Sequence, residues 1–333
     1  MGQVNKRGTT PGARPSASQP QPDLEPSRCH PSQRRASQAH MAEGERVPFQ
    51  RDTKIAVLTV GNEVLTGGNR SALSRVLLPA MQSLHGAVAA LGLDKQITVT
   101  TAHNLGVLGT SYPPSAGAFR KDLLPYLCPI LDYQARTGSP FLVNAYPYFA
   151  YSDDPKGVQL DYALLEPGYA GVQDPNSRLH YPNLLVAQVD AVYHAIAAAN
   201  TAASRVVEVR VSETGWPSAG AANETGATPR NAARYNSNAM RLVAEGRGTP
   251  LKPGVPLRAY VFALFNENLK PGLASERYYG LFKPMARRRP LVAGVGADGR
   301  GGRRGSRADG GGVRSRRGAA RTALMEWQIV RGG

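Results

Sequence analysis

The stretch "RVVEVRVSETGWPS" (residues 205–218) decides how the rest of the chain is interpreted. Its valine-rich start is typical of a buried β-strand, because branched side chains pack well on a pleated surface. The run leads directly into the carboxylate of Glu213, and the indole of Trp216 follows three residues later. A carboxylate beside an aromatic ring suits carbohydrate chemistry, but cleavage of a glycosidic bond needs a second carboxylate. The interpretation therefore depends on whether another strand end supplies one.

Four other segments of the 333-residue chain have the same apolar, β-branched character. They are "KIAVLTVG" (54–61), "QITVTTA" (96–102), "PFLVNAY" (140–146) and "RAYVFALF" (258–265). Apolar runs without strict alternation are typical of strands that are covered on both faces. With residues 205–212, these segments predict five buried strands.

Amphipathic helical segments lie between these strands. Apolar residues recur at helical spacing in residues 71–91, 115–136, 184–199 and 229–245. In the last of these, Thr228 can cap the start and Gly246 suits the end. Strands that alternate with helices predict a parallel α/β sheet, and no glycine-rich phosphate-binding motif supports a nucleotide fold. We predict a (β/α)8 TIM-type barrel that is incomplete, with about five of the eight βα units.

The net charge of +16 is concentrated at the two ends of the chain. Residues 1–54 hold nine Lys/Arg against five Asp/Glu, and residues 285–333 hold twelve Arg against three acids, which leaves +3 for residues 55–284. The ends are rich in Pro, Ser, Gln, Gly and Arg and lack apolar periodicity, which is typical of disorder. We predict a disordered head over 1–53, a folded domain over 54–284 and a disordered tail after it.

The basic tails raise the question of a nucleic-acid partner. No aromatic residue is interleaved with the arginines of residues 297–318, so we expect no nucleic-acid partner. No apolar run is long enough to cross a membrane, and the N-terminus has no secretory signal. Cys29 and Cys128 form no disulfide framework, and His103 and His194 have no ligand partners at metal spacing, so we expect no metal.

The strand ends carry the candidate functional residues, because a barrel places its site at the carboxyl ends of its strands. The first strand delivers Asn62 and Glu63, the third delivers Tyr146 and the fourth delivers Glu213. Glu63 and Glu213 come from non-adjacent strands, which predicts that they lie across the barrel mouth from each other. Such a pair suits glycoside hydrolysis, in which one carboxyl group is protonated and the other ionised.

Each of these residues also has a simpler interpretation. A glutamate at a strand end is often a solvated loop charge, and Asn62 could cap the following turn. Trp216 and Tyr146 could be ordinary core aromatics, and the acids of "NENLKP" (266–271) a surface charge run. The pattern of several such segments in order favours a site over these alternatives.

The segments "VGNEV", "NAYPYF", "VSETGWPS" and "FALFNENLKPG", followed by "ASERYYGLF", resemble the signature segments of the plant endo-1,3-β-glucanases, glycoside hydrolase family 17. The resemblance covers roughly residues 54–284. It implies a retaining hydrolase of β-1,3-glucan on a (β/α)8 barrel, with the present strands corresponding to strands four to eight. It also implies that Glu63 is the general acid/base and Glu213 the nucleophile.

The same resemblance assigns substrate-binding roles to further residues. It implies that Asn62 reaches a sugar 2-hydroxyl, that Tyr146 packs on a sugar face and that Trp216 walls the site beside the nucleophile. The charged residues that match a cluster near the family's active site are Glu267, Lys270 and Glu276. A lysine there can hold nearby carboxylates ionised.

The resemblance implies no organic cofactor, since a proton donor and a carboxylate nucleophile suffice. It further implies a monomer when complete, secreted to the cell wall or apoplast. The first three strands of such a barrel are missing before residue 54, and the sequence departs from the family after Met285. Five strands cannot close at the eight-strand radius, so we expect the chain alone not to hydrolyse laminarin. The alternatives are a non-catalytic glucan-binding remnant and a basic-tailed nucleic-acid binder.

Overall fold

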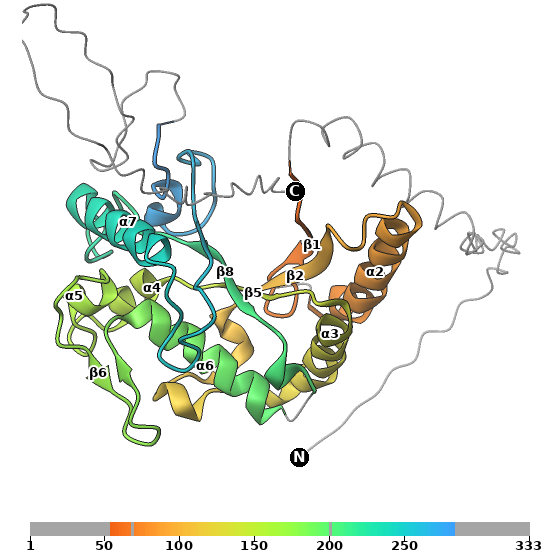
Figure 1. Ribbon diagram of the computed structural model, residues 1–333. Helices are drawn as coiled ribbons and strands as arrows, with labels where there is room; N and C mark the ends of the chain where they lie inside the picture. Colours follow the sequence, from red (N-terminus) through yellow and green to blue (C-terminus); the bar gives the residue numbers. More distant parts are fainter. Residues whose placement is uncertain (1–53, 68–69, 200–201, 284–333) are drawn as a thin grey trace, which may run out of the picture.

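A computed structural model of the chain describes residues 54–67, 70–199 and 202–283 (Figure 1). The predicted head and tail lie outside these residues. At the centre is a five-stranded sheet in which every neighbouring pair is parallel. Its strands, in spatial order, are β1 (Val57–Asn62), β2 (Thr98–Asn104), β5 (Phe141–Asn144), β8 (Val209–Thr214) and β9 (Ala259–Val261). The structure therefore confirms the parallel α/β architecture and puts all five predicted strand segments in one sheet.

Helices connect consecutive strands of this sheet. The α-helices are α2 (Arg70–Ala90), α3 (Leu124–Thr137), α4 (Pro147–Asp153), α5 (Leu160–Ala163), α6 (Leu184–Ala198) and α7 (Pro229–Ala244). Two small antiparallel pairs, β3 (Leu108–Thr110) with β4 (Ala118–Phe119) and β6 (Val172–Gln173) with β7 (His180–Tyr181), extend the connections after β2 and β5. The remaining turns are 3-10 helices η2 (Leu105–Val107), η3 (Pro114–Ala116), η4 (Lys121–Leu123), η5 (Ala202–Arg205) and η6 (Ala274–Arg277).

Local sequence signals fix most helix ends. Asn183 caps α6 by accepting a hydrogen bond from Val186 N at 3.1 Å, and Thr228 caps α7 by accepting one from Asn231 N at 3.2 Å. Each cap satisfies one of the backbone donors that a helix start leaves free. The predicted helices over 71–91, 184–199 and 229–245 are confirmed within one residue at each end.

Some predicted boundaries were wrong, and one expected helix is absent from the described residues. The helix predicted over 115–136 begins only at Leu124, with Pro125 in its first turn. Before it, Gly117 lies so close to the backbone of Ala191 that an added Cβ would meet the carbonyl oxygen at 2.1 Å. Packing on α6 thus takes this segment out of the helix. The strand predicted to start at residue 205 starts at Val209, after η5. After β9, the described chain forms η6 and no α-helix.

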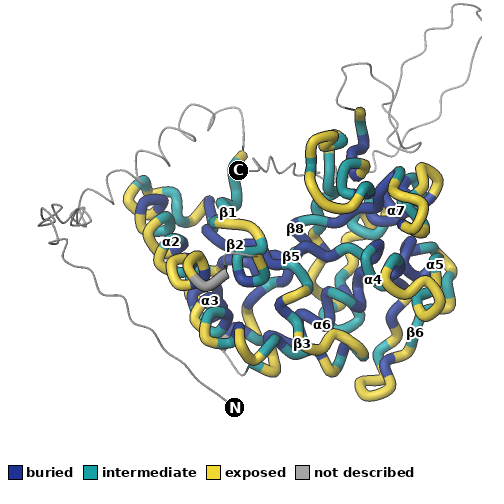
Figure 2. The backbone as a smooth tube through the Cα atoms, turned by 180° about the vertical axis from the view of Figure 1, so that it is seen from behind, coloured by how far each residue is buried: buried dark blue, intermediate teal, exposed yellow. Residues whose placement is uncertain are grey.

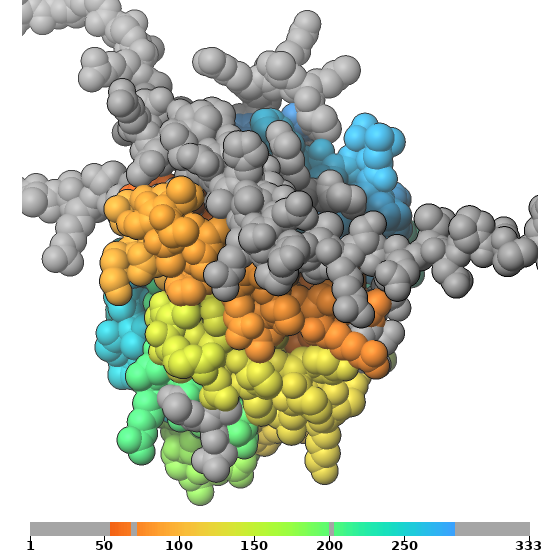
Figure 3. All heavy atoms as spheres, turned by 90° about the vertical axis from the view of Figure 1, so that its right-hand side faces the viewer, coloured from red at the N-terminus to blue at the C-terminus, as the bar shows by residue number. Residues whose placement is uncertain are grey.

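Burial is greatest in the middle of the sheet. All four residues of β5 are buried, and so are five of the seven in β2. The outer strands β1 and β9 have no buried residue. Figure 2 shows the central strands and α6 as the most buried part of the molecule. Figure 3 shows the face where the orange surface of residues 54–90 adjoins the yellow segment that follows β2.

None of the helices in the described ranges is both long and apolar enough to cross a membrane.

Candidate active site

The two candidate glutamates stand at the carboxyl ends of β1 and β8, where the strand pairing is irregular. Between β1 and β2 the register passes from Thr59↔Thr100 to Asn62↔Ala102, so β1 carries one extra residue. Between β5 and β8 it passes from Val143↔Val211 to Asn144↔Glu213, which makes Ser212 the extra residue. Such bulges occur beside active sites because they redirect a side chain.

The backbone of Glu63 adopts a left-handed conformation, with φ at +55°. This conformation is strained for a residue with a side chain, and it persists only where neighbouring contacts hold it. Here Glu63 N donates to Ala102 O at 2.9 Å, and Glu63 O accepts from the backbone N–H groups of Thr66 and Gly67 at 3.1 and 3.0 Å. The turn after β1 therefore fixes the direction of the Glu63 side chain.

Two asparagine side chains hold the carboxylate of Glu63. Asn144 Nδ2 donates to Glu63 Oε1 at 2.8 Å, and Asn104 Nδ2 donates to Glu63 Oε2 at 2.9 Å. Asn144 Nδ2 also donates to Asn62 Oδ1 at 3.0 Å. Three neighbouring strand ends, those of β1, β2 and β5, thus meet at one carboxyl group.

Glu213 is held by a different kind of neighbour. The hydroxyl of Tyr146 donates to Glu213 Oε2 at 2.9 Å. Burial raises the pKa of Glu213, and the charge of Glu63 raises it further. The hydrogen bond from Tyr146 and the positive charge of Lys270 oppose that rise. The charge of Glu63 thus acts on Glu213, which places the two carboxyl groups in one electrostatic site.

Lys270 is the centre of the charged cluster that the sequence predicted. Its Nζ lies 3.1 Å from Glu276 Oε2 and 3.4 Å from Glu267 Oε2, and 4.6 Å from the centre of the Phe262 ring. Burial lowers the pKa of Lys270, but Glu276 and Glu267 outweigh that effect, so the net shift is upward. Lys270 is therefore positively charged at neutral pH, and its charge favours the ionised form of Glu213.

Aromatic side chains form the wall around Tyr146. Its ring contacts those of Phe149, Tyr279 and Phe262, with centroid separations of 5.4, 5.5 and 6.3 Å. Burial and the nearby Glu213 raise the pKa of Tyr146 well above its ordinary value. The phenol thus stays protonated and remains a hydrogen-bond donor to Glu213.

Trp216 does not form the wall that the sequence predicted. Only 1% of the residue is exposed, and its Nε1 donates to Gly226 O at 2.8 Å. The indole packs against the rings of Tyr148 and Tyr235, with centroids at 5.2 and 5.6 Å. It is a core residue here, because the bend after β8 turns it away from Glu213 and into the aromatic packing under α7.

Sequence reasoning missed the polar residues that support the glutamates. Asn144 and Ser212 lie within the predicted strand segments and Asn104 lies two residues beyond one, but none of them was assigned a role. Their position was the available signal, since polar side chains at the ends of buried parallel strands converge at one edge of the sheet. Asn144 is only 2% exposed, so its polar atoms need partners within the protein.

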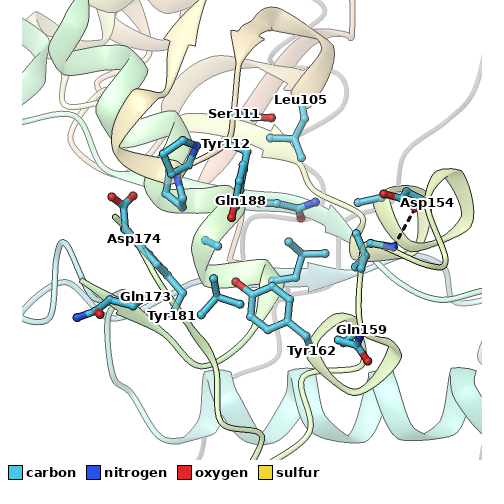
Figure 4. A pocket seen from close by; sticks show the side chains of 18 of the residues that line it. Leu105, Ser111, Tyr112, Asp154, Gln159, Tyr162, Gln173, Asp174, Tyr181 and Gln188 are labelled. Atoms are coloured by element: carbon cyan, nitrogen blue, oxygen red, sulfur yellow. Dashed lines mark hydrogen bonds between the residues drawn. The ribbon is translucent and has the colours of Figure 1, made fainter. Parts of the chain in front are cut away.

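A separate cavity of about 480 Å³ lies among β6, β7 and the segments before α5 and α6 (Figure 4). None of the predicted site residues lines it. Its two acids already have hydrogen-bond donors: Asp154 accepts from Gly157 N at 2.9 Å, and Asp174 accepts from the backbone and hydroxyl of Ser115 at 2.8 and 2.7 Å. The paired carboxylates, and not this cavity, define the candidate active site.

Among the described residues, no group of three or more His, Cys, Asp or Glu side chains is arranged to hold a metal ion.

A parallel α/β sheet with two coupled glutamates at its strand ends is the arrangement of a glycoside hydrolase. Comparison with known proteins agrees, because the sequence pattern of glycosyl hydrolases family 17 matches residues 33–289. The chain belongs to this family.

Similar proteins come from plants. Glucan endo-1,3-beta-glucosidase 14 of Arabidopsis thaliana is 54% identical over 71% of this chain and 59% of its own length. Glucan endo-1,3-beta-glucosidase 10 of the same plant is 56% identical over 70% of this chain and 54% of its own length. The chain thus spans a little over half the length of these relatives.

Solved structures of two plant enzymes are similar in fold. A beta-1,3-glucanase and allergen of Cryptomeria japonica pollen superposes with a TM-score of 0.71 at 38% identity, covering 78% of this chain and 77% of that one. A plant beta-glucan endohydrolase gives a TM-score of 0.65 at 36% identity, covering 76% and 78%. These neighbours and the parallel sheet fit an α/β TIM-type fold.

Proposed function

We propose that the site hydrolyses internal bonds of β-1,3-glucan with retention of configuration at the anomeric carbon. The observation that carries this proposal is the electrostatic coupling of Glu63 and Glu213 at two strand ends of one parallel sheet. The plant relatives named as glucan endo-1,3-beta-glucosidases support the substrate class. We take the sheet to be strands four to eight of a (β/α)8 barrel.

In the first step, the Glu213 carboxylate attacks the anomeric carbon while the Glu63 carboxyl group protonates the departing glycosidic oxygen. The C–O bond of the leaving sugar breaks as the glycosyl–Glu213 ester forms. In the second step, Glu63 takes a proton from water, the resulting hydroxide attacks the anomeric carbon and Glu213 leaves as a carboxylate. The hydrogen bond from Tyr146 and the charge of Lys270 support the ionised form of Glu213 that this attack requires.

Other side chains would bind the glucan. Asn62 is exposed beside Glu63 and offers an amide to a sugar hydroxyl. Tyr146 is partly exposed, and Glu267, Lys270 and Glu276 supply charged hydrogen-bonding groups in the segment that follows β9. We expect the protein to act as a monomer on glucan in the cell wall or apoplast.

The test is hydrolysis of laminarin by the full chain, followed through new reducing ends, with Glu213→Gln and a Glu245→Gln control at the exposed end of α7. The strand count predicted an inactive chain, but the described sheet holds Glu63 and Glu213 in one site, so we now expect cleavage by the parent and the control and none by Glu213→Gln. Proton NMR of the earliest product should show the β-anomer, whereas a first α-anomer would contradict retention. Retention of the parent chain on insoluble β-1,3-glucan without cleavage would instead indicate a glucan-binding protein.

A further inference from the structure

Asn144 links the two catalytic strand ends. It lies at the end of β5, between β2 and β8 in the sheet. Its side-chain nitrogen donates to Glu63 Oε1 at 2.8 Å, and its oxygen accepts from Ser212 Oγ at 2.7 Å. Ser212 is 3% exposed and immediately precedes Glu213. A chain of two hydrogen bonds therefore connects the strand of one glutamate to the carboxyl group of the other.

The bulge in β8 makes this link possible. Successive side chains of a regular strand point to opposite faces, so Ser212 and Glu213 would point to opposite sides of the sheet. The extra residue in β8 changes this alternation at Ser212 and brings its hydroxyl to Asn144. The same irregularity also sets the direction of Glu213, since Asn144 is the register partner of Glu213.

The orientation of both amides is determined by their second partners. The Ser212 hydroxyl occupies Asn144 Oδ1, so the donating nitrogen of Asn144 faces Glu63. Gly106 N donates to Asn104 Oδ1 at 2.9 Å, so the nitrogen of Asn104 faces Glu63 as well. Each carboxylate oxygen of Glu63 thus accepts one N–H group. Hydrogen bonds to the charged form favour that form.

We propose that Ser212, Asn144 and Asn104 are positioning residues that hold the carboxyl group of Glu63 in the direction that proton transfer requires. This inference rests on the proposed role of Glu63 as proton donor. Asn144 is the firmer of the two supports, because it is buried and held by Ser212, whereas Asn104 is partly exposed at a turn.

Few charged groups face Glu63 from other elements. Glu213 on β8 is the one whose electrostatic interaction with Glu63 is shown, and Lys270 and Glu267 act on Glu213 in turn. A change at Asn144 or Asn104 leaves these charges in place. The effect of either change can therefore be assigned to the lost hydrogen bond.

Asn144→Leu gives the sharpest test in the full chain. It keeps roughly the same size and adds no charge, but it removes the donor that faces Glu63 and the oxygen that accepts from Ser212. Misplacement of a catalytic group by about 1 Å costs on the order of 10²-fold, so kcat on laminarin should fall about 10²-fold with little change in KM. Ser212→Ala should cost about tenfold. For Asn104→Ala we expect a smaller loss, because Asn144 still holds the other oxygen of Glu63.

The matched control is Thr101→Val, which removes a buried hydroxyl from the same sheet. Thr101 Oγ1 is without a hydrogen-bond partner within the described part of the chain, and the change preserves the shape. Its kinetics and pH profile should equal those of the parent. If Thr101→Val lowers kcat as much as Ser212→Ala, the effect is general to the sheet and the positioning role is wrong.

Carbon-13 NMR of the chain labelled at glutamate carboxyl groups tests the network without relying on activity. The Glu63 signal is identified by its loss in Glu63→Gln. It should change position in Asn144→Leu and Asn104→Ala, because each variant removes an N–H donor from the carboxyl group, and it should be unchanged in Thr101→Val. An unchanged signal in both asparagine variants overturns the inference. A parent chain that leaves laminarin intact overturns the proposed function, while the signal still decides whether the two amides support Glu63.

Discussion

The ends of β1 and β8 present the same residue type in two different environments. At the end of β1, Glu63 has a left-handed backbone and two amide donors, and Asn62 beside it is exposed. At the end of β8, Glu213 remains within the strand, is partly buried, and is held by the phenol of Tyr146 with Lys270 nearby. The surroundings of Glu63 are thus mainly hydrogen-bond donors. For Glu213 the main effect is burial, and the positive charge of Lys270 opposes that effect.

This difference shows how one fold can give two glutamates separate tasks. A carboxyl group's role in acid–base chemistry is set by its surroundings and not by its residue type. Burial raises the pKa of Glu213, which alone would disfavour a nucleophile. Tyr146 and Lys270 offset that effect. The site therefore depends on keeping both residues beside Glu213, and on the two amide donors beside Glu63.

The largest expected effect is that of Glu213→Gln, which preserves size and hydrogen bonding but removes the nucleophile. Activity on laminarin should fall by about three orders of magnitude or more, because the covalent route is lost. In Glu213→Gly, which leaves room for a small anion, added azide should restore part of the turnover and give a glycosyl azide of α-configuration, since the azide attacks where the carboxylate did. A β-configured product would mean that Glu213 is not the nucleophile. The two strand ends would then not have the separate roles proposed for them.

A smaller and substrate-dependent effect is expected for Glu63→Gln. General acid catalysis contributes roughly 10²–10⁴-fold, so laminarin hydrolysis should fall within that range. Aryl β-glucosides with good leaving groups need little protonation and should keep a rate of glycosylation close to that of the parent, seen as a burst of phenol. An equal loss on both classes of substrate would contradict the role of Glu63 as proton donor.

The sequence was sufficient to predict those strands and helices whose formation depends on the local pattern of apolar and capping residues. Buried strands such as residues 140–146 follow from continuous apolar runs, and α7 follows from its cap at Thr228. The convergence of Glu63 and Glu213 followed from the rule that parallel strands end at one edge of the sheet. The resemblance to one family, now confirmed by the match over residues 33–289, added the chemistry.

Tertiary packing decided what the sequence could not show. The segment before Leu124 has a helical pattern, but contact between Gly117 and the α6 backbone imposes another path. Trp216 follows Glu213 closely in sequence, yet a bend sends its ring into the core. The support of Glu63 by Asn104 and Asn144 depends on distances across three strands and on one-residue bulges. No periodicity in the sequence encodes such contacts.

A change in pH dependence should separate the two strand ends further. Tyr146→Phe removes the hydrogen bond that stabilises the Glu213 carboxylate, and Lys270→Gln removes an attractive charge. Both changes leave the ionised form less favoured, so the acid limb of the kcat/KM profile should move to higher pH. The movement should be larger for Tyr146→Phe, whose contact is the stronger of the two. An alkaline-limb shift instead would mean that these residues act on the proton donor.

The smallest expected effect on activity is that of Trp216→Phe, which tests whether the indole belongs to the core or to the cleft. The change leaves a gap beside Tyr148 and Tyr235 and removes the N–H donor to Gly226 O, which still accepts from Asn231 at 3.0 Å. Loss of packing and of one hydrogen bond should lower the free energy of unfolding by about 2–3 kcal/mol. Below the melting transition, KM for laminarin should stay within about twofold of the parent, since a residue 1% exposed offers no face to a sugar. Urea unfolding measured alongside kinetics distinguishes a core position from a cleft position. A KM raised tenfold with unchanged stability would mean that the indole contacts the substrate.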